Sequence, residues 1–196
     1  GLEGADRFLR RIWNFAYENQ ALLKDTTLNA DAITDKAAKD ARREIHQELK
    51  KALYDYERFH FNTVISANMI ILNILGKLKD SKDDAAVKQE GFSIMLRLLS
   101  PIVPHIVHTI WESLFGDDIL GHALPQPSES ALVADEVKYM VQVNGRLRGE
   151  IIVPASASKE EIEKEALANE NAVKFIEGTI RRVIVVPNRL VNIVAN

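Results

Sequence analysis

The dipeptide Asn144-Gly145 lies between two runs rich in β-branched residues, and it constrains the fold of this chain more than any other short feature. Both residues tolerate positive φ angles, which the tightest β-hairpin turns require. The flanking segments, 140–143 and 147–153, therefore predict two antiparallel strands. Within residues 181–194, two further runs rich in β-branched residues flank Pro187-Asn188. They predict two more strands in the same small sheet.

Two loop lengths are compatible with the first hairpin. A two-residue loop sets Val143 opposite Arg146, whereas a three-residue loop, 144–146, pairs Val143 with Leu147. The burial of one face fixes the register of a one-sided sheet, so we expect the longer loop with a bulge. Arg146 would then project from the tip, and Gln142 and Arg148 from the outer face. The longer loop gathers the apolar and small residues on the inner face: Val141, Val143, Leu147, Gly149, Ile151 and Val153.

Residues 1–120 carry apolar residues at helical spacing. The stripes predict helices over 6–17, 34–53, 56–79 and 106–115, with another through Phe92 and Leu99 that ends at Pro101. Helices joined by short loops pack as an antiparallel bundle. The sequence thus predicts a helical domain over residues 1–120.

Residues 121–135 lack periodicity and contain Pro125 and Pro127, which is typical of a linker. A small ββαββ domain is expected over residues 136–196. Its helix should open with Ser158 and Glu161, which have the spacing of a capping box, and end at Gly178. The expected fold class is α+β, with an N-terminal antiparallel helical bundle followed by this small domain.

Composition narrows the functional classes. The chain is 46% hydrophobic and 27% charged, as an ordinary soluble protein is. It has no cysteine, which excludes disulfides, thiolate zinc sites and cysteine nucleophiles and fits a reducing cytosol. No run of about 18 apolar residues predicts a membrane-spanning helix. The chain begins Gly-Leu-Glu-Gly without an initiator methionine or a signal-peptide pattern, so we expect it to be part of a longer protein.

The net charge of −3 conceals an uneven distribution. Residues 136–196 carry nine Lys or Arg against eight acidic residues, a net charge of +1, and five of those acids fall in the segment predicted as a helix. The strands and turns are therefore basic. An acidic helix behind a basic sheet predicts a module with one side that attracts polyanions.

Catalytic patterns are not found in the sequence. It has no glycine-rich phosphate loop, no dinucleotide-binding fingerprint and no nucleophile elbow. His105 and His108 have a spacing that could supply two metal ligands, but no cysteine or paired carboxylate completes a set, so helix packing is expected. Trp13 and Trp111 lie on apolar helix faces, which predicts core or interdomain packing. We predict no catalytic and no metal-binding residue.

Several segments resemble bacterial-type leucyl-tRNA synthetases. The Val-Gln-Val-Asn-Gly-Arg-Leu-Arg-Gly core of residues 140–151 and residues 185–194 are similar to the C-terminal domain of that family. Residues 1–13, 61–69 and 101–111 are similar to the family's helical anticodon-binding domain. The motifs occur in the family's order and cover essentially the whole chain.

The resemblance implies an aminoacyl-tRNA ligase of translation, with this chain as its tRNA-docking end. In the intact enzyme, leucine would be joined to tRNA-Leu with ATP and magnesium, bound by a catalytic domain outside this chain. No cofactor is expected within the chain itself. A cytoplasmic monomer is expected, with no membrane partner. In this family the small C-terminal domain contacts the outer corner and long variable arm of the tRNA.

The residues expected to bind tRNA are the arginines and asparagines of the predicted sheet. Folded RNA is recognised through its shape, phosphates and 2′-hydroxyl groups, which suit these side chains. Two other classes stay open: a ubiquitin-like protein-interaction module that binds a partner by strand addition, and an independent enzyme around His105 and His108. The predicted tRNA-binding residues are Asn144, Arg146, Arg148, Arg181, Arg182, Arg189 and Asn192.

Overall fold

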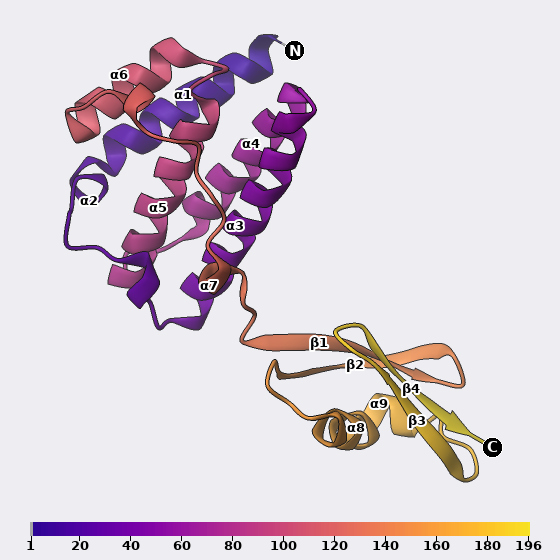
Figure 1. Ribbon diagram of the computed structural model, residues 1–196. Helices are drawn as coiled ribbons and strands as arrows, with labels where there is room; N and C mark the ends of the chain where they lie inside the picture. The colour runs from indigo at the N-terminus through magenta and orange to yellow at the C-terminus, as the bar shows by residue number, and fades with distance from the viewer. Residues whose placement is uncertain (1) are drawn as a thin grey trace. The chain divides into compact units, whose positions relative to one another are not determined.

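The computed structural model describes residues 2–196 and divides into two compact units (Figure 1). The helical unit extends to Val133, and the small unit is Ala134–Asn196. The helical unit consists of packed helices, whereas the small unit is built on a four-stranded sheet. The predicted α+β class, a helical bundle followed by a small sheet domain, is confirmed.

Five long helices and several short ones make up the helical unit. Side-chain caps define two of the starts: Asp35 accepts from the N–H of Ala38, and Ser81 accepts from that of Asp84. Among the helices of residues 2–196, none combines the length and apolarity needed to cross a bilayer. The elements are α1 (Leu2–Glu18), α2 (Gln20–Leu23), η1 (Ala30–Ala32), α3 (Lys36–Glu57), α4 (Phe61–Lys77), α5 (Lys82–Leu99), α6 (Pro104–Phe115), η2 (Ile119–Gly121) and α7 (Glu129–Leu132).

The core of the helical unit surrounds α5, which contacts α2, α3, α4 and α6. Phe92 on α5 is fully buried, and its ring lies 5.0 Å from that of Phe15 on α1, centroid to centroid. Leu49 of α3 and Leu75 of α4 are also fully buried. Every long helix of this unit thus contributes its apolar stripe to one shared core.

The segment predicted as a linker, 121–135, belongs largely to the helical unit. It contains the end of η2 and all of α7, and its Pro125 and Ala131 are buried. Helix α7 packs on α3. The domain borders at 120 and 136 stay a prediction, whereas the compact helical unit continues to Val133.

The small unit has the sheet order β2-β1-β4-β3. The neighbours β1 and β4 are parallel, and the two outer pairs are antiparallel. Helices α8 and α9 cover one face of the sheet, where Val141, Ile151 and Ile193 meet Ile162 and Ala166 in a second core (Figure 1). The elements are β1 (Glu136–Val143), β2 (Arg146–Pro154), α8 (Lys159–Ala168), α9 (Glu170–Val173), β3 (Ile180–Val186) and β4 (Leu190–Ala195).

The helical segment of the small unit starts as predicted and ends early. Ser158 and Glu161 form the expected capping box. The helix does not continue to Gly178, because Asn169 has an extended ψ of 109° and starts α9. Its side-chain oxygen accepts from the N–H of Ala172, and its amide donates to the carbonyl of Glu150. These local hydrogen bonds compete with helix continuation.

The predicted three-residue hairpin loop is wrong. Val143 pairs with Arg146, and the two loop residues, Asn144 and Gly145, have φ angles of 49° and 78°. Two positive φ angles give a turn whose twist matches that of the strands. The extra residue is Arg148, a bulge that shifts the register between Val141 and Gln142. The bulge, rather than the loop, returns Gly149, Ile151 and Val153 to the helix-covered face.

Two side chains change their predicted environment as a result. Leu147, expected in the core, is 57% exposed. Arg148, expected on the outer face, stacks on Phe175 in the segment that follows α9.

Candidate nucleic-acid interface

Three exposed arginines lie along one edge of the small sheet, the edge at which its strands begin or end. The parallel pairing of β1 and β4 brings the 144–145 turn, the end of β4 and the start of β3 to that edge. Arg146 follows the turn, and Arg181 and Arg182 begin β3. We term Arg146, Arg181 and Arg182 the basic edge. β2 and β3 are three strand spacings apart, so the edge is about 14 Å wide.

Both arginines of the pair in β3 face solvent. Arg182 lies opposite Val194 on the face that the helices do not cover, and Arg181 occupies a register shift between Ile180 and Arg182. This bulge explains why strict alternation does not turn one of the two towards the helices.

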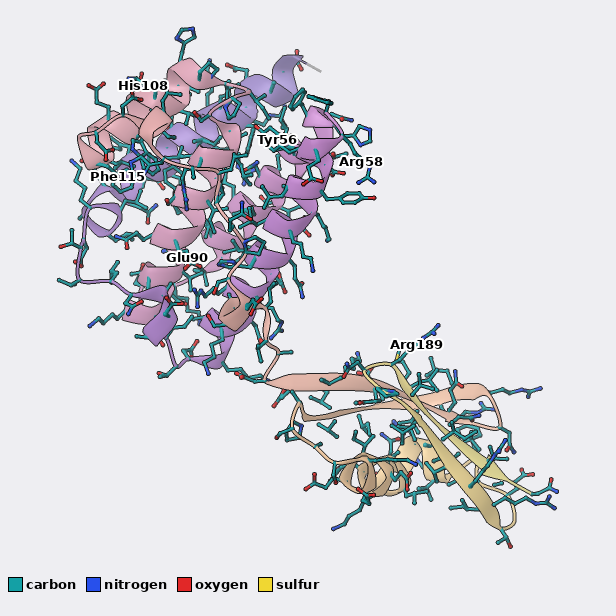
Figure 2. All side chains as sticks on the ribbon, viewed as in Figure 1. Tyr56, Arg58, Glu90, His108, Phe115 and Arg189 are labelled. Atoms are coloured by element: carbon teal, nitrogen blue, oxygen red, sulfur yellow. The ribbon has the colours of Figure 1, made fainter. Side chains whose placement is uncertain are left out.

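Arg189 does not belong to the basic edge. It lies at the turn between β3 and β4, at the other end of β4 (Figure 2). Its side chain is exposed, and its carbonyl accepts from the N–H of Met140 at 3.1 Å. Any anion contact made by Arg189 is thus separate from those at the edge.

Arg148 is held within the small unit. Its guanidinium carbon lies 3.9 Å from the centroid of the Phe175 ring, a cation–π contact. Its Nε is buried without a hydrogen-bond partner. This arginine therefore braces the hairpin against the helical segment.

The two predicted asparagines fasten the turn that carries Arg146. Asn192 of β4 accepts from the N–H of Gly145 at 3.0 Å, and Asn144 accepts from the N–H of Ala195 at 3.0 Å. The reciprocal hydrogen bonds fix the hairpin tip against β4. Their direct role in tRNA binding stays a prediction, whereas their support of the basic edge is visible.

Sequence reasoning missed the apolar character of the uncovered sheet face. Met140 pairs with Leu190, and Leu190 with Val186, so the three side chains form a row across the sheet. On β2, Leu147 and Ile152 lie on the same face, separated by Glu150, which forms an ion pair with Lys138; the two apolar side chains are 57% and 62% exposed. We term Met140, Leu147, Ile152, Val186 and Leu190 the open face. Their alternation with core residues was the available signal, and exposed apolar patches commonly mark interaction sites.

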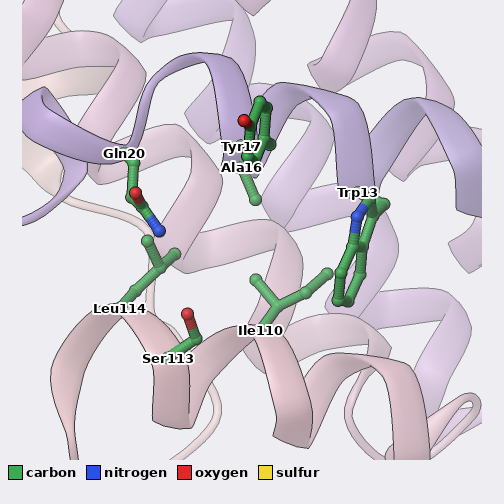
Figure 3. A pocket seen from close by; sticks show the side chains of 7 residues that line it. All are labelled: Trp13, Ala16, Tyr17, Gln20, Ile110, Ser113 and Leu114. Atoms are coloured by element: carbon green, nitrogen blue, oxygen red, sulfur yellow. The ribbon is translucent and has the colours of Figure 1, made fainter.

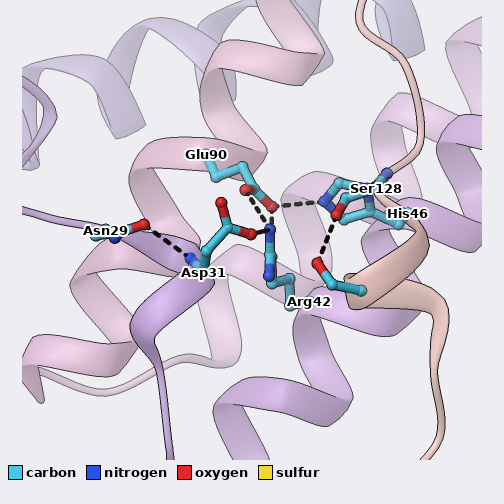
Figure 4. Close-up of polar contacts among 7 residues, drawn as sticks. Asn29, Asp31, Arg42, His46, Glu90 and Ser128 are labelled. Atoms are coloured by element: carbon cyan, nitrogen blue, oxygen red, sulfur yellow. Dashed lines mark hydrogen bonds and ion pairs between the residues drawn. The ribbon is translucent and has the colours of Figure 1, made fainter.

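The helical unit contains a buried polar network of a different kind (Figure 4). Arg42 and His46 of α3 are 6% and 3% exposed, and both contact Glu90 of α5. Arg42 donates to both carboxylate oxygens of Glu90 at 2.9 Å and to Asp31 at 2.8 Å. Burial alone would raise the pKa of Glu90, but the hydrogen bonds from His46 and Arg42 outweigh it and lower that pKa. The network joins α3, α5 and η1.

The predicted histidine pair does not form a ligand cluster. His105 is exposed in the first turn of α6, and His108 Nδ1 lies 3.5 Å from Asp118 Oδ1. Within residues 2–196, no three side chains of His, Cys, Asp or Glu come together as a metal site would require. The nearby acidic residue Asp117 instead accepts hydrogen bonds from His122 and Trp111, which lower its pKa.

The two tryptophans differ in environment. Trp111 is buried as predicted and donates to Asp117 at 2.7 Å. Trp13 is 48% exposed and lines a shallow apolar hollow between α1 and α6, with Tyr17 and Ile110 (Figure 3). Packing of Trp13 against another part of the protein stays a prediction. The hollow contains no titratable pair that could serve acid–base chemistry.

Comparisons with known proteins give the class of the protein. Residues 38–164 match the family model described as the anticodon-binding domain of tRNA ligase. The chain belongs to this family. Within the class, it matches the C-terminal region of bacterial leucine–tRNA ligases.

The leucine–tRNA ligase of Azoarcus sp. is 52% identical over 99% of this chain. That of Herminiimonas arsenicoxydans is 48% identical over 100% of this chain. The chain spans 23% of each relative. A solved ternary complex of the Agrobacterium radiobacter agnB2 LeuRS with tRNA and LeuAMS covers 97% of the chain at a TM-score of 0.83 and 26% identity. The chain covers 25% of that structure. These matches confirm the resemblance found in the sequence.

Proposed function

We propose that this chain is the tRNA-docking part of a leucine–tRNA ligase, with the small unit as a main contact. The observation that carries the proposal is the basic edge, on a sheet whose uncovered face also exposes apolar side chains. Arginine guanidinium groups suit phosphate oxygens, and they fix the orientation of a nucleic acid without reading its bases. The tRNA-ligase relatives favour RNA over the alternative peptide partner.

The shape of the surface suits folded RNA rather than an extended strand. Arg146 lies about 14 Å from the arginines of β3, so the basic edge would hold two separate points of the backbone. On the open face of the same sheet, Met140 and Leu190 lie side by side towards the other end of β4. Unstacked bases at a loop or corner of an RNA present flat apolar surfaces, which such a face could cover. This arrangement fits the outer corner and variable arm of tRNA-Leu.

The remaining parts of the proposal concern the full-length enzyme. Leucine, ATP and magnesium would bind in the part of the relatives that this chain does not span. The enzyme would act in the cytoplasm as a monomer. The chain itself would contribute affinity and orientation, and no catalytic group.

The salt dependence of tRNA binding tests the proposal. In the full-length enzyme, the double substitution Arg146→Ala with Arg182→Ala should weaken binding of tRNA-Leu. It should also flatten the plot of log affinity against log salt by about 1.4–1.8, because each lost phosphate contact contributes roughly 0.7–0.9.

The matched control is Lys164→Ala with Lys174→Ala, which removes two exposed cations on the helix side of the same unit. This control should leave the slope within error of the unsubstituted enzyme. An equal slope for the arginine variant and the control would remove the basic edge from the interface.

A further inference from the structure

Residues 122–133 form a strap along the helical unit. They leave η2 and reach α7, which packs on α3. Buried Pro125 and Ala131 anchor the strap by packing. Between these two residues, the N–H of Ser128 donates to Nδ1 of His46 at 3.0 Å (Figure 4).

His46 is held from both sides. Its Nε2 lies 2.5 Å from Oε1 of Glu90, whose two oxygens also accept from Arg42. A backbone N–H can donate only to a ring nitrogen with a free lone pair, so Nδ1 carries no proton. Nε2 therefore carries the proton and donates a hydrogen bond to Glu90. The buried network thus orients His46 so that its acceptor points at the strap.

We propose that His46 is a positioning residue that keeps the strap on the helical unit and thereby sets the length of the tether to the small unit. With the strap held, only residues 133–135 separate α7 from β1. With the strap released, the segment between η2 and β1 would be residues 122–135, which is about five times longer. The inference rests on the proposed tRNA function, because the tether length matters only if both units serve one ligand.

Tether length acts on affinity through effective concentration. Once a linker spans the distance between two binding sites, the local concentration of the tethered module falls as about the 3/2 power of further linker length, or more steeply. A fivefold longer segment would therefore lower the effective concentration of the small unit near a bound tRNA about tenfold. The salt slope of binding would stay unchanged, since no phosphate contact is removed.

Two substitutions of His46 separate its two contacts. His46→Asn places an amide oxygen near the position of Nδ1, so it can still accept from Ser128. His46→Gln places its amide near the position of Nε2, so it keeps the contact with Glu90. It has no acceptor near the position of Nδ1, so it loses the hydrogen bond from Ser128. Ser128→Pro removes the donor itself, and the φ of Ser128, −80°, suits proline.

Hydrogen exchange in the full-length enzyme gives the direct measurement. Amides of residues 122–133 should exchange about tenfold faster in His46→Gln and Ser128→Pro, and close to the unsubstituted rate in His46→Asn. Affinity for tRNA-Leu should fall up to about tenfold in the first two variants, with the salt slope unchanged. Hydrogen exchange at the buried amides of α5, measured in the same experiment, controls for general damage to the helical unit.

Unchanged exchange in both His46→Gln and Ser128→Pro would show that His46 does not hold the strap. If His46→Gln does not fold, Ser128→Pro decides alone, because it alters no side chain of the buried network. Faster exchange with unchanged or tighter tRNA binding would overturn the positioning role. That result would leave the basic edge untouched, since its substitutions are judged by the salt slope.

Discussion

The helical unit and the small unit differ in where their charged side chains lie: the first buries several of them, and the second exposes them. In the helical unit, five long helices enclose a core deep enough to bury Arg42 and His46 against Glu90. In the small unit, the core is a single layer between the sheet and two short helices. Arg146, Arg181 and Arg182 therefore lie exposed at the basic edge, and apolar side chains remain on the open face. A deep core can enclose charged side chains in hydrogen bonds that hold helices together. A thin core leaves charged and apolar side chains on the surface, where they can contact a partner.

The largest expected effect tests whether the two units are stable independently. Phe92→Ala would leave a cavity at the centre of the helical unit, where the side chain is fully buried. The free energy of unfolding of that unit should fall by about 3–5 kcal/mol. Both tryptophans, Trp13 and Trp111, lie in the helical unit, so tryptophan fluorescence during urea unfolding follows this unit specifically.

The control is Leu147→Ala, which truncates a large apolar side chain that is exposed on the small unit. It should leave the tryptophan transition in place. Hydrogen exchange in β1 and β4 should stay slow in Phe92→Ala if the small unit folds by itself. Equal acceleration in both units would contradict the independence on which the comparison rests.

The sequence predicted the helical unit more completely than the details of the small unit. Long apolar stripes such as those through Leu49 and Phe92 specify helices locally. The strap was missed as structure because its proline-containing segment has no periodicity, and its docking depends on the distant side chain of His46. Tertiary partners of this kind leave no local pattern.

The candidate site shows the same limit. The sequence shows which residues of the sheet are arginines, and their role in tRNA binding stays a prediction. Their grouping depends on the parallel pairing of β1 and β4, which local sequence does not specify. Arg148 was placed on the wrong face because a bulge and a longer loop satisfy the same alternation of apolar residues. Arg189 was grouped with the others, although the topology places it at the other end of β4.

A smaller effect is expected from removing the charge at the centre of the buried network. Glu90→Gln should lower the free energy of unfolding of the helical unit at neutral pH by roughly 2 kcal/mol, since charged hydrogen bonds to Arg42 and His46 are weakened. The pKa of Glu90 is lower in the folded protein than its ordinary value of 4.5. Its contribution is therefore fully present above about pH 4.5 and is lost as the pH falls through the folded-state value.

Urea unfolding from pH 7 to pH 3, followed by tryptophan fluorescence, measures this difference. The variant should lose less stability than the unsubstituted protein on acidification, so the two curves converge. Glu44→Gln, which removes the charge of an exposed residue of α3, should keep the original pH dependence. Parallel curves for Glu90→Gln and the unsubstituted protein would show that Glu90 does not carry the acid sensitivity.

The smallest effect concerns a single cap in the small unit. Ser158 accepts from the N–H of Glu161 at 3.2 Å, and the Glu161 carboxylate accepts from the N–H of Ser158 at 2.7 Å. Ser158→Ala removes the first of these and should cost about 1 kcal/mol. A single core of this size supplies only about 3–5 kcal/mol, so the loss is a substantial share of the stability of the unit. The helical unit should not respond, because the cap touches none of its residues.

Hydrogen exchange of β1 and β4 should therefore accelerate about fivefold in Ser158→Ala, the factor that about 1 kcal/mol corresponds to. The tryptophan transition should stay where it is. Ser156→Ala, in the exposed turn before the helix, removes a hydroxyl without removing a cap and should change neither measurement. A shift of the tryptophan transition in Ser158→Ala would mean that the thin core and the deep core unfold together. In that case the strap would couple the stability of the two units as well as set the tether, and the small unit would owe its stability partly to the helical one.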